Sequence, residues 1–501
     1  MKKILALLLA ALMLCPLFIA CKDSEENPDI TSSSVPDVTV PVVEEDTPDL
    51  PSPEEIGDIS GDFNILVSGN YARNDFKSDG EGGTAVETAI YRRNMYIKDT
   101  YDVDILNEDI IRFGSANGSG DGYAKIYMDY MAGETNYDAA MVGTYDVATL
   151  AYSGYIHDLN DIPHLDLSKD YWDQKANADL AINGKMYYTT GDISTVDNVT
   201  THAMIFNKDM LKAYELDDPY QLVREGKWTL ETLGTLVRQV GEDANQDGIY
   251  NENDIYGLLT WNDPMLAILA GAGEKICTIN ADGLIELSFY SERVVSLYDT
   301  FTNLVYDNTH VYNYQYDYQL GKGTPSSVWD TNRIKMFDSN QAVFYFNLLT
   351  VVEKHRDSET DFGILPYPKF DAEQADYGHM VSAFHCSFLC VPEMSKDFER
   401  TGIILEELAY QGKKLLTPAY YDQTLVGQYT RDEESVDMLD IIFSSRVYDV
   451  GIYYNIGTYK DQLARMFTQR TPIASMYETY RNTADTKINQ INSIFQVVSG
   501  D

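Results

Sequence analysis

Short apolar runs alternate with longer amphipathic stretches over the first third of the chain. The short runs predict buried strands, and the stretches between them carry apolar residues at helical spacing. This alternation is typical of a mainly parallel sheet flanked by helices, so the sequence predicts an α/β fold. The expected strands cover 62–68, 101–106 and 137–143, and the expected helices cover about 86–99 and 120–132.

The loops that follow these strands are the first candidates for ligand contact. In parallel α/β sheets, ligands bind beyond the carboxyl ends of the strands. The first expected strand leads into Asn70 and Tyr71, and the third leads into Tyr145. We therefore expect these three side chains to line a binding site.

Turn and cap signals continue the pattern further along the chain. Asn183-Gly184 lies between two periodic segments and predicts a hairpin turn. The stretch 203–211 reads as a strand that leads into a helix. A second helix is expected from Leu230 to Val240, with Thr229 as its N-cap.

Several short motifs occur in an order that resembles a known family. They are Asn-Gly-Lys-Met-Tyr-Tyr at 183–188, Ile-Phe-Asn-Lys-Asp-Met-Leu at 205–211, Gly-Lys-Trp-Thr at 226–229, Asp-Ile-Tyr-Gly at 254–257, Ala-Val-Phe-Tyr-Phe-Asn at 342–347, Asp-Phe-Gly-Ile-Leu-Pro-Tyr-Pro at 361–368 and Cys-Ser-Phe-Leu-Cys-Val-Pro at 386–392. Together, over roughly 62–500, they resemble the family 1 extracellular solute-binding proteins, which include the maltose-binding protein. Members of that family are lipoprotein receptors of ABC importers.

The resemblance implies a type II periplasmic-binding-protein fold. Two lobes, each a mainly parallel sheet flanked by helices, would be joined by hinge strands near 198–204 and 381–387. The amino-terminal lobe would take 62–200 and about 388–435, and the other lobe would take 201–384 and about 436–501. A solute would close into the cleft between them and pass to an ABC permease, so the resemblance implies a monomeric receptor and no enzyme.

The amino-terminal segment resembles the signal peptide of a bacterial lipoprotein. Met1-Lys2-Lys3 is basic, and the apolar run 4–14 is too short to span a bilayer comfortably. Phe-Ile-Ala-Cys at 18–21 resembles a lipobox, although Phe18 stands where Leu is usual. The resemblance implies cleavage after residue 20, lipidation of Cys21 and anchoring at the outer face of the cytoplasmic membrane. The alternative is an ordinary secreted protein that is cut nearby.

The strongly negative charge of the chain argues against one class of partner. Residues 22–61 contain one Lys and 12 acidic residues, which predicts an extended, unstructured tether. The whole chain carries 79 acidic and 37 basic residues, a formal net charge of −42. Such a surface repels phosphate backbones, so nucleic acid is not an expected partner.

Cys277, Cys386 and Cys390 are the thiols that remain after the signal segment. An odd number does not make a disulfide framework. Two strand residues four apart lie about 13 Å from each other, so Cys386 and Cys390 cannot pair locally. We expect buried, inert thiols.

The stretch 243–254 has the spacing of a calcium-binding loop. Oxygen-bearing side chains would come from Asp243, Asn245, Asp247, Asn251 and Asp254, and a carbonyl would come from Ile249. Gly248 stands where the loop needs a sharp turn, but Asp254 replaces the Glu of an EF-hand. The sequence therefore predicts a structural Ca²⁺ site. The alternative is an acidic turn held by side-chain to backbone hydrogen bonds.

Aromatic and polar side chains elsewhere suggest a carbohydrate as ligand. The chain has 38 Tyr, and sugar sites combine aromatic platforms with hydroxyl-binding groups. Each candidate could equally belong to the core or to the surface. Beyond the three residues given above, the candidates are Tyr188, Asp192, Trp261, Asp263, Trp329, Phe346 and His385.

Two alternatives stay open at this point. The acidic body could favour a peptide, an amino acid or a polyamine in place of a sugar. A surface glycosidase is also conceivable, because spacing along a sequence cannot reveal a pair of carboxylates that the fold brings together. The chain contains no phosphate-binding Gly-rich loop, no His-Glu-x-x-His and no Gly-x-Ser-x-Gly motif.

Overall fold

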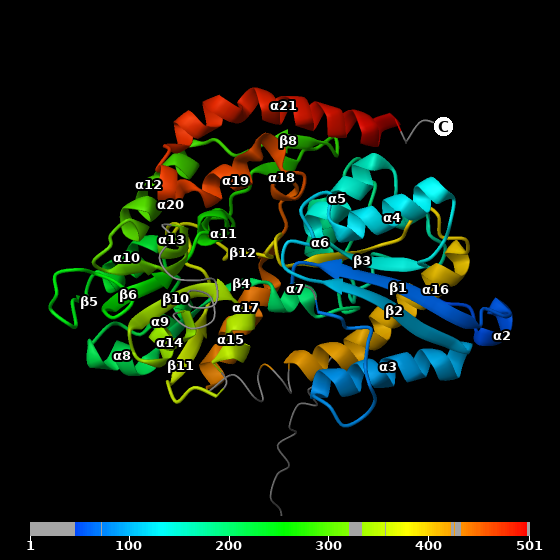
Figure 1. Cartoon of the computed structure of the whole chain (residues 1–501), viewed down its shortest axis with the longest axis horizontal. Helices are drawn as coiled ribbons and strands as arrows, with labels where there is room; N and C mark the ends of the chain where they lie inside the picture. Colours follow the sequence, from blue (N-terminus) through cyan, green and yellow to red (C-terminus); the bar gives the residue numbers. More distant parts are fainter. Residues whose placement is uncertain are drawn as a thin grey trace, which may run out of the picture. The chain divides into compact units, whose positions relative to one another are not determined.

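Two separate β-sheets organise the chain in the computed structural model, which describes residues 46–71, 73–319, 333–355, 357–421, 425 and 432–497 (Figure 1). The first sheet has the strand order β13-β3-β1-β2, and the second has the order β11-β4-β10-β6-β5, with β9 paired to β6. Helices flank both sheets, so the predicted α/β class with two sheets is confirmed.

The first sheet contains the three strands expected from the alternating pattern. β1 pairs in parallel with both β2 and β3, and β13 joins β3 in the antiparallel direction. Helix α3 begins with a capping box in which Thr84 and Glu87 satisfy each other's backbone N–H groups. The elements here are α2 (Pro53–Ile56), β1 (Gly61–Gly69), α3 (Ala85–Tyr101), β2 (Val103–Ile111), α4 (Asp121–Ala132), β3 (Ala139–Gly143), α5 (Thr144–Ser153), η1 (Leu159–Asp161), α6 (Gln174–Leu180), α7 (Val196–Val199), β13 (Ser387–Cys390), α16 (Phe398–Gln411) and η3 (Gly412–Leu416).

The second sheet is more mixed. β10 runs parallel to β6 but antiparallel to β4, and β4 is also antiparallel to β11. The Thr229 side chain caps α10 as predicted, since it accepts from the N–H of Thr232. The elements are β4 (His202–Asn207), α8 (Lys208–Ala213), α9 (Pro219–Arg224), α10 (Leu230–Val237), β5 (Gly241–Glu242), β6 (Ile255–Thr260), α11 (Pro264–Gly271), β7 (Cys277–Ile279), β8 (Ile285–Leu287), α12 (Glu292–Val305), β9 (Val311–Asn313), α13 (Tyr314–Gln319), α14 (Arg333–Asp338), β10 (Ala342–Leu348), α15 (Thr350–Lys354), β11 (Phe362–Leu365) and β12 (His379–Met380).

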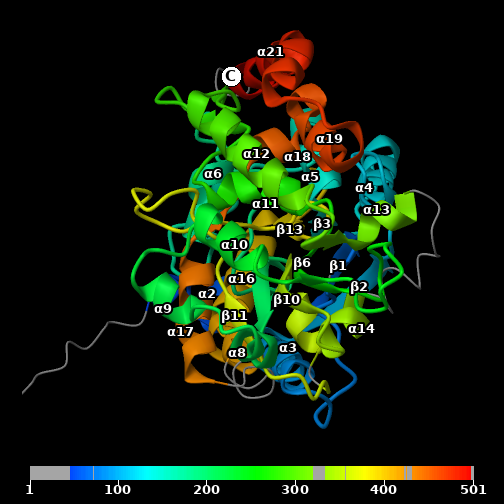
Figure 2. The same ribbon diagram turned by 90° about the vertical axis from the view of Figure 1, so that its left-hand side faces the viewer.

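The chain ends in helices that follow a short strand paired with β12. The last helix, α21, contacts both α12 and α5, and it runs along the top of the view in Figure 1. Figure 2 gives the same structure from the side of the second sheet, with α10 and α12 toward the viewer. These elements are α17 (Glu433–Ser444), β14 (Arg446–Val447), α18 (Val450–Tyr453), η5 (Ile456–Thr458), α19 (Tyr459–Ala464), α20 (Met466–Gln469) and α21 (Ile473–Val497).

Two connections between the sheets run side by side. Thr201 and Val381 form an antiparallel bridge, and the N–H of Ser382 donates to the carbonyl of Thr200 over 3.0 Å. Strands β4 and β13 each begin directly after one of these connections. They therefore enter their sheets from the edge that carries the carboxyl ends, which explains why both run against their neighbours.

The stretch 46–61 differs from the expectation of an unstructured tether. Asp46 accepts from the Lys169 ammonium over 3.0 Å, and the short helix α2 carries its own capping box of Ser52 and Glu55. The ion pair joins residues 123 positions apart, so local composition gave no sign of it. Among the residues that the structure describes, no helix is long and apolar enough to cross a membrane.

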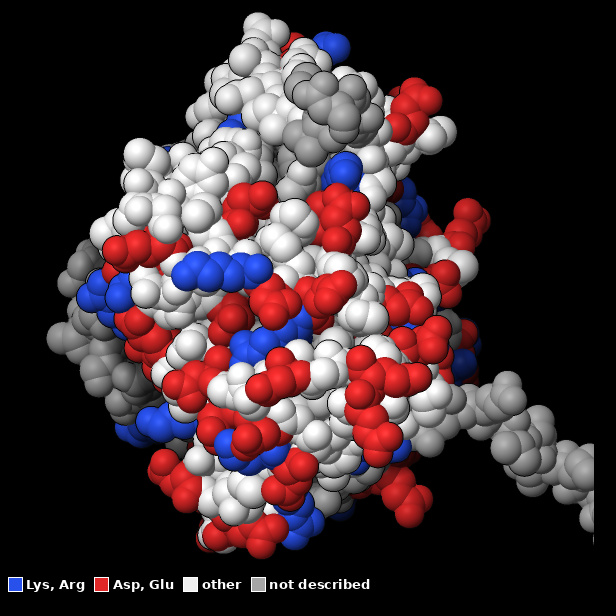
Figure 3. Space-filling model, turned by 90° about the vertical axis from the view of Figure 1, so that its right-hand side faces the viewer, with Lys and Arg blue, Asp and Glu red and all other residues white. Residues whose placement is uncertain are grey.

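The acidic composition is visible on the surface. Figure 3 shows one face of the molecule on which Asp and Glu side chains outnumber Lys and Arg. The thiols of Cys277, Cys386 and Cys390 are all buried and free, which confirms the expectation of inert cysteines. Burial raises the pKa of each thiol, so none is a reactive thiolate at neutral pH.

Candidate functional site

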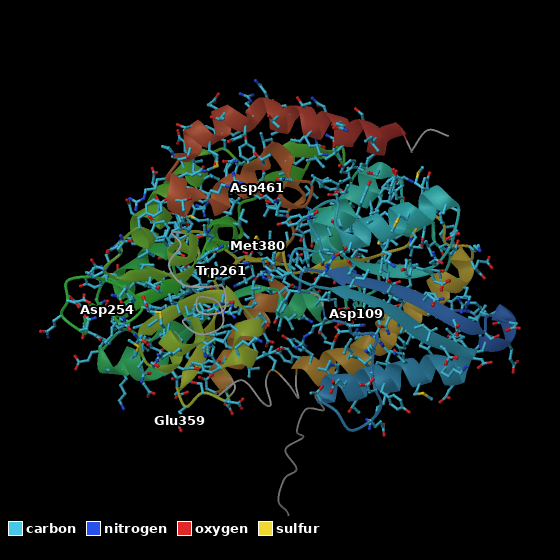
Figure 4. The ribbon with its side chains drawn as sticks, in the orientation of Figure 1. Asp109, Asp254, Trp261, Glu359, Met380 and Asp461 are labelled. Carbon is cyan, nitrogen blue, oxygen red and sulfur yellow. The ribbon has the colours of Figure 1, made fainter. Side chains whose placement is uncertain are left out.

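The carboxyl ends of several strands gather at one edge of the second sheet. Because β6, β9, β10 and β11 share a direction and β4 opposes them, their last residues lie beside the first residue of β4. This edge presents Trp261 after β6, Asn347 near the end of β10, and His202 at the start of β4. The sequence placed Trp261 correctly at a strand end. Figure 4 shows Trp261 at the inner end of β6 and Asp254 at its outer end.

The corresponding edge of the first sheet meets this one directly. The His385 ring lies 6.1 Å from the Trp261 ring, centroid to centroid, in an edge-on arrangement. The Tyr71 hydroxyl lies 3.0 Å from the Thr350 hydroxyl, and the Arg73 guanidinium lies 2.5 Å from the Glu353 carboxylate. The two sets of strand ends therefore contact each other directly, at a place that we call the interlobe junction after the two lobes that the sequence predicts.

His385 supplies a neutral imidazole at the interlobe junction. Its Nδ1 lies 2.8 Å from the Ser382 hydroxyl, and burial lowers its pKa to about 4, with the Arg333 charge adding to the effect. His202 is fully buried, and burial holds its pKa well below the usual value. Its ring stacks near Trp261 at 6.2 Å. Both imidazoles are thus uncharged at neutral pH, and of the two only the half-buried His385 adds a flat, weakly polar surface beside the indole.

Asp263 brings a half-buried carboxylate to the start of α11. Burial raises its pKa to about 7, and only the Lys460 ammonium acts in the opposite direction. Among the described residues, no side chain or backbone N–H donates to this carboxylate. Lys460 itself lies over the Tyr145 ring at 4.5 Å and pairs with Asp461 at 2.7 Å. The Asp263 carboxylate therefore has acceptor capacity that a bound molecule could use.

Asn70 holds two loops beside the interlobe junction together through hydrogen bonds. Its amide donates to the carbonyls of Ala116 and Phe384 over 2.9 and 3.0 Å, and it accepts from the N–H of Ala116. With only 5% of its surface exposed, it positions the loops around Tyr71 and His385. Asn70 thus serves to hold the loops in place, since its hydrogen-bonding groups are already occupied.

The structure does not bring all the candidates together. Tyr188 and Phe346 pack in the core, with Tyr188 against Phe388 and Phe346 between Phe301 and Tyr367. Every residue of β10 is buried. The strand therefore lacks an alternation of exposed and buried positions from which a ligand-facing ring could be recognised. Trp329 lies outside the described residues, as does Cys21.

Asp192 lies in a different place, a pocket of about 420 Å³ beside the connections between the sheets. The pocket is lined by Asp170, Asp173, Asp192, Asp197 and Asp440, with Arg446 as its cation. Arg446 pairs with Asp173 at 2.7 Å and with Asp197 at 3.0 Å. Burial raises the pKa of Asp192 to about 6, and the hydroxyl of Thr417 donates to it.

Two aromatic residues at the edge of the first sheet did not stand out in the sequence. Phe113 follows β2 and is 87% exposed, and its ring lies 5.5 Å from that of Phe384. Phe384 in turn lies 5.0 Å from His385. Phe113-Gly114 follows the true end of β2 at Ile111, and a residue beyond a strand end is a candidate for ligand contact. The sequence predicted that this strand ends at 106, so the position of Phe113 was not recognised.

The loop 243–254 forms a turn held by side-chain oxygens. Asp243 accepts from the N–H of Gly248 over 2.7 Å, and Asp247 accepts from that of Ile249 over 2.8 Å. The fully buried Asp254 accepts from the N–H groups of Ala244 and Asn251. No group of three His, Cys, Asp or Glu side chains suited to a metal occurs in the described parts of the chain. Calcium binding here stays a prediction.

Comparison with models of known protein families gives one match. The model of the bacterial extracellular solute-binding protein family matches residues 111–383, more than half of the chain. The chain belongs to this family. The matched region spans the second sheet and its connections, and membership assigns the protein to solute binding rather than catalysis. No match was found among the curated proteins.

Several solved structures of solute-binding proteins have a similar fold, and three of them hold a sugar. The galacto-N-biose/lacto-N-biose I-binding protein of Bifidobacterium longum, in complex with lacto-N-biose, is 11% identical, with a TM-score of 0.58 over 86% of this chain and 98% of that one. A maltose/maltodextrin-binding domain of Bdellovibrio bacteriovorus bound to maltotriose is 13% identical, with a TM-score of 0.54 over 86% and 100%. A Listeria monocytogenes ABC substrate-binding protein in complex with cycloalternan is 13% identical, with a TM-score of 0.54 over 85% and 99%. At these identities the likeness shows the fold alone.

Proposed function

We propose that this solute-binding protein captures a carbohydrate at the interlobe junction and delivers it to an ABC importer. The observation that carries the proposal is the contact between the Trp261 and His385 rings at facing strand ends, with Asp263 two residues after Trp261 at the start of α11. The rings offer flat apolar surfaces for the C–H face of a sugar ring. The Asp263 carboxylate, which no described group satisfies, would accept hydrogen bonds from sugar hydroxyl groups.

Two further parts of the proposal concern delivery. Lipidation of Cys21 would tether the receptor to the outer face of the cytoplasmic membrane, near its permease. A single acyl signal binds reversibly, so stable anchoring requires the multiple chains of a bacterial lipoprotein. Ligand binding would shift an equilibrium between open and closed arrangements of two lobes, the first built on β1–β3 and β13 and the second on β4, β6, β10 and β11.

A thermal-stability screen of the protein against mono- and oligosaccharides tests the proposal. A ligand at 100 times its Kd adds about 2.7 kcal/mol to the free energy of unfolding, which gives a clear shift in Tm. Trp261→Ala and Asp263→Asn are expected to remove the shift, whereas Tyr290→Ala, at an exposed position on the stretch before α12, should retain it. A sugar that stabilises all three variants equally would show that the interlobe junction is not the site.

One observation favours the alternative of a cationic cargo such as a polyamine, a basic peptide or an amino acid. The 420 Å³ pocket beside the connections carries five aspartates against one arginine, an excess of negative charge that would attract an ammonium group. Spermidine and basic dipeptides belong in the same screen. Stabilisation by amines and by no sugar, lost in Asp192→Asn and kept in Asp263→Asn, would replace the carbohydrate proposal with this one.

A further inference from the structure

A row of aromatic rings leads from the rim of the first sheet to the interlobe junction. Neighbouring ring centroids lie 5.5 Å apart for Phe113 and Phe384, 5.0 Å for Phe384 and His385, and 6.1 Å for His385 and Trp261. Exposure falls along the row. Phe113 is 87% exposed, Phe384 and His385 are half-buried, and Trp261 is 7% exposed.

The backbone holds Phe113 in this exposed position. The N–H of Ser115 donates to the carbonyl of Arg112 over 3.0 Å, which closes a turn with Phe113 and Gly114 at its centre. Gly114 has a φ of +80°, as the third residue of a type II turn requires. The N–H of Arg112 and the hydroxyl of Ser115 both donate to the carbonyl of Gly69 at the end of β1. The turn is therefore fixed to the sheet, and its tip points a phenyl ring into solvent.

This exposure needs a reason, because every other ring of the row is at least half-buried. A fully buried Phe stabilises a fold by about 1.5–3 kcal/mol relative to an exposed one, and Phe113 gives up most of that contribution. The next ring inward, Phe384, is held through its backbone carbonyl, which accepts from Asn70. The row is thus continuous from solvent to the proposed sugar contacts.

We propose that Phe113 is an outer aromatic platform that makes the protein selective for carbohydrate chains longer than one or two sugar rings. This inference rests on the proposed carbohydrate function and deepens it. A single ring would occupy the contacts at Trp261, His385 and Asp263. Each further ring would extend along Phe384 toward Phe113, and the ligand itself would cover the exposed phenyl ring.

The test is the dependence of affinity on chain length. Isothermal calorimetry on the full chain compares maltose, maltotriose and maltotetraose, and parallel series of cello-, xylo- and galacto-oligosaccharides of two to four rings. In the series that binds, the wild type should gain affinity with length. Phe113→Ala should lose about fivefold to tenfold on the longest chain and little on the shortest. Phe113→Tyr, which keeps a ring, should retain the gain.

Met131→Ala is the matched control, because Met131 is another exposed apolar side chain, 64% exposed, on α4 beside the same sheet. It should leave every affinity unchanged. Equal losses for all chain lengths in Phe113→Ala, or no loss in any, would overturn the inference while the carbohydrate function stood. Unchanged affinities together with impaired uptake would assign Phe113 to the permease instead. Failure of every saccharide to bind would overturn the proposed function, and this inference with it.

Discussion

Replacing Asp263 by Asn should stabilise the protein and at the same time weaken ligand binding. In the folded protein, burial raises the pKa of Asp263 from 3.8 to about 7. The folded state therefore holds the proton more tightly than the unfolded state does. Stability is lost as the pH rises from 3.8 to about 7, because ionising the carboxyl costs more in the fold than in the unfolded chain.

The size of the effect follows from the shift. At 1.36 kcal/mol per pH unit, the shift corresponds to about 4 kcal/mol above pH 7. Because the side chain is still partly exposed to solvent, we expect roughly half of this, about 2 kcal/mol. Asn is nearly isosteric with Asp and carries no charge. Asp263→Asn should thus match the wild type near pH 4 and exceed its stability by about 2 kcal/mol at pH 8.

Urea unfolding of the two proteins at pH 4.5, 6 and 8, without ligand, measures this difference directly. Other acidic groups titrate in both proteins and cancel in the comparison. Asp209→Asn, an exposed position on α8, should show no such pH-dependent gain. A difference that does not grow with pH, or an Asn variant that is less stable at pH 8, would refute the reasoning.

Three further predictions concern the ion pairs of Arg446, the loop 243–254 and the buried carboxyl group of Glu406. Arg446→Met leaves the buried carboxylates of Asp173 and Asp197 unpaired and should cost about 3–5 kcal/mol in urea unfolding, mostly recovered when both aspartates are changed to Asn. Calcium at 1 mM should raise the Tm and a chelator should reverse the rise, an effect that Asp247→Asn removes; an unchanged Tm would leave 243–254 a plain turn. Burial raises the pKa of Glu406 to about 7 although its carboxylate accepts from Tyr171 and Trp172, so Glu406→Gln should gain stability relative to the wild type as the pH rises from 4.5 to 8; a difference in urea unfolding that stays constant with pH would contradict this.

The alternating pattern of the amino-terminal third was enough to predict the first sheet. β1, β2, β3, α3 and α4 all occur where the pattern indicated, with ends that differ by a few residues. Local signals such as the Thr229 cap and the Asn183-Gly184 turn were also correct, since they depend on neighbouring residues. The direction in which each strand runs could not be predicted from such local signals. β4 and β13 run against their neighbours because of where the chain enters the sheet, which no local pattern records.

Only part of the candidate site could be predicted from the sequence. Trp261 and His385 could be identified from the sequence because each lies beside a strand with a clear apolar run. The structure brings their rings together. Phe346 looked similar in sequence but lies on a strand buried on both faces. His202 and Phe113 were missed for opposite reasons. His202 is buried at the start of β4. Phe113 is exposed on a turn after β2, and the sequence predicted the end of that strand too early.

A crystal structure of the protein with an oligosaccharide identified by the screen tests the central claim most directly. The account predicts a sugar ring against Trp261 and His385, with a hydroxyl group within hydrogen-bond distance of the Asp263 carboxylate. A ligand seated in the pocket of Asp192 and Arg446, with the interlobe junction empty, would contradict it.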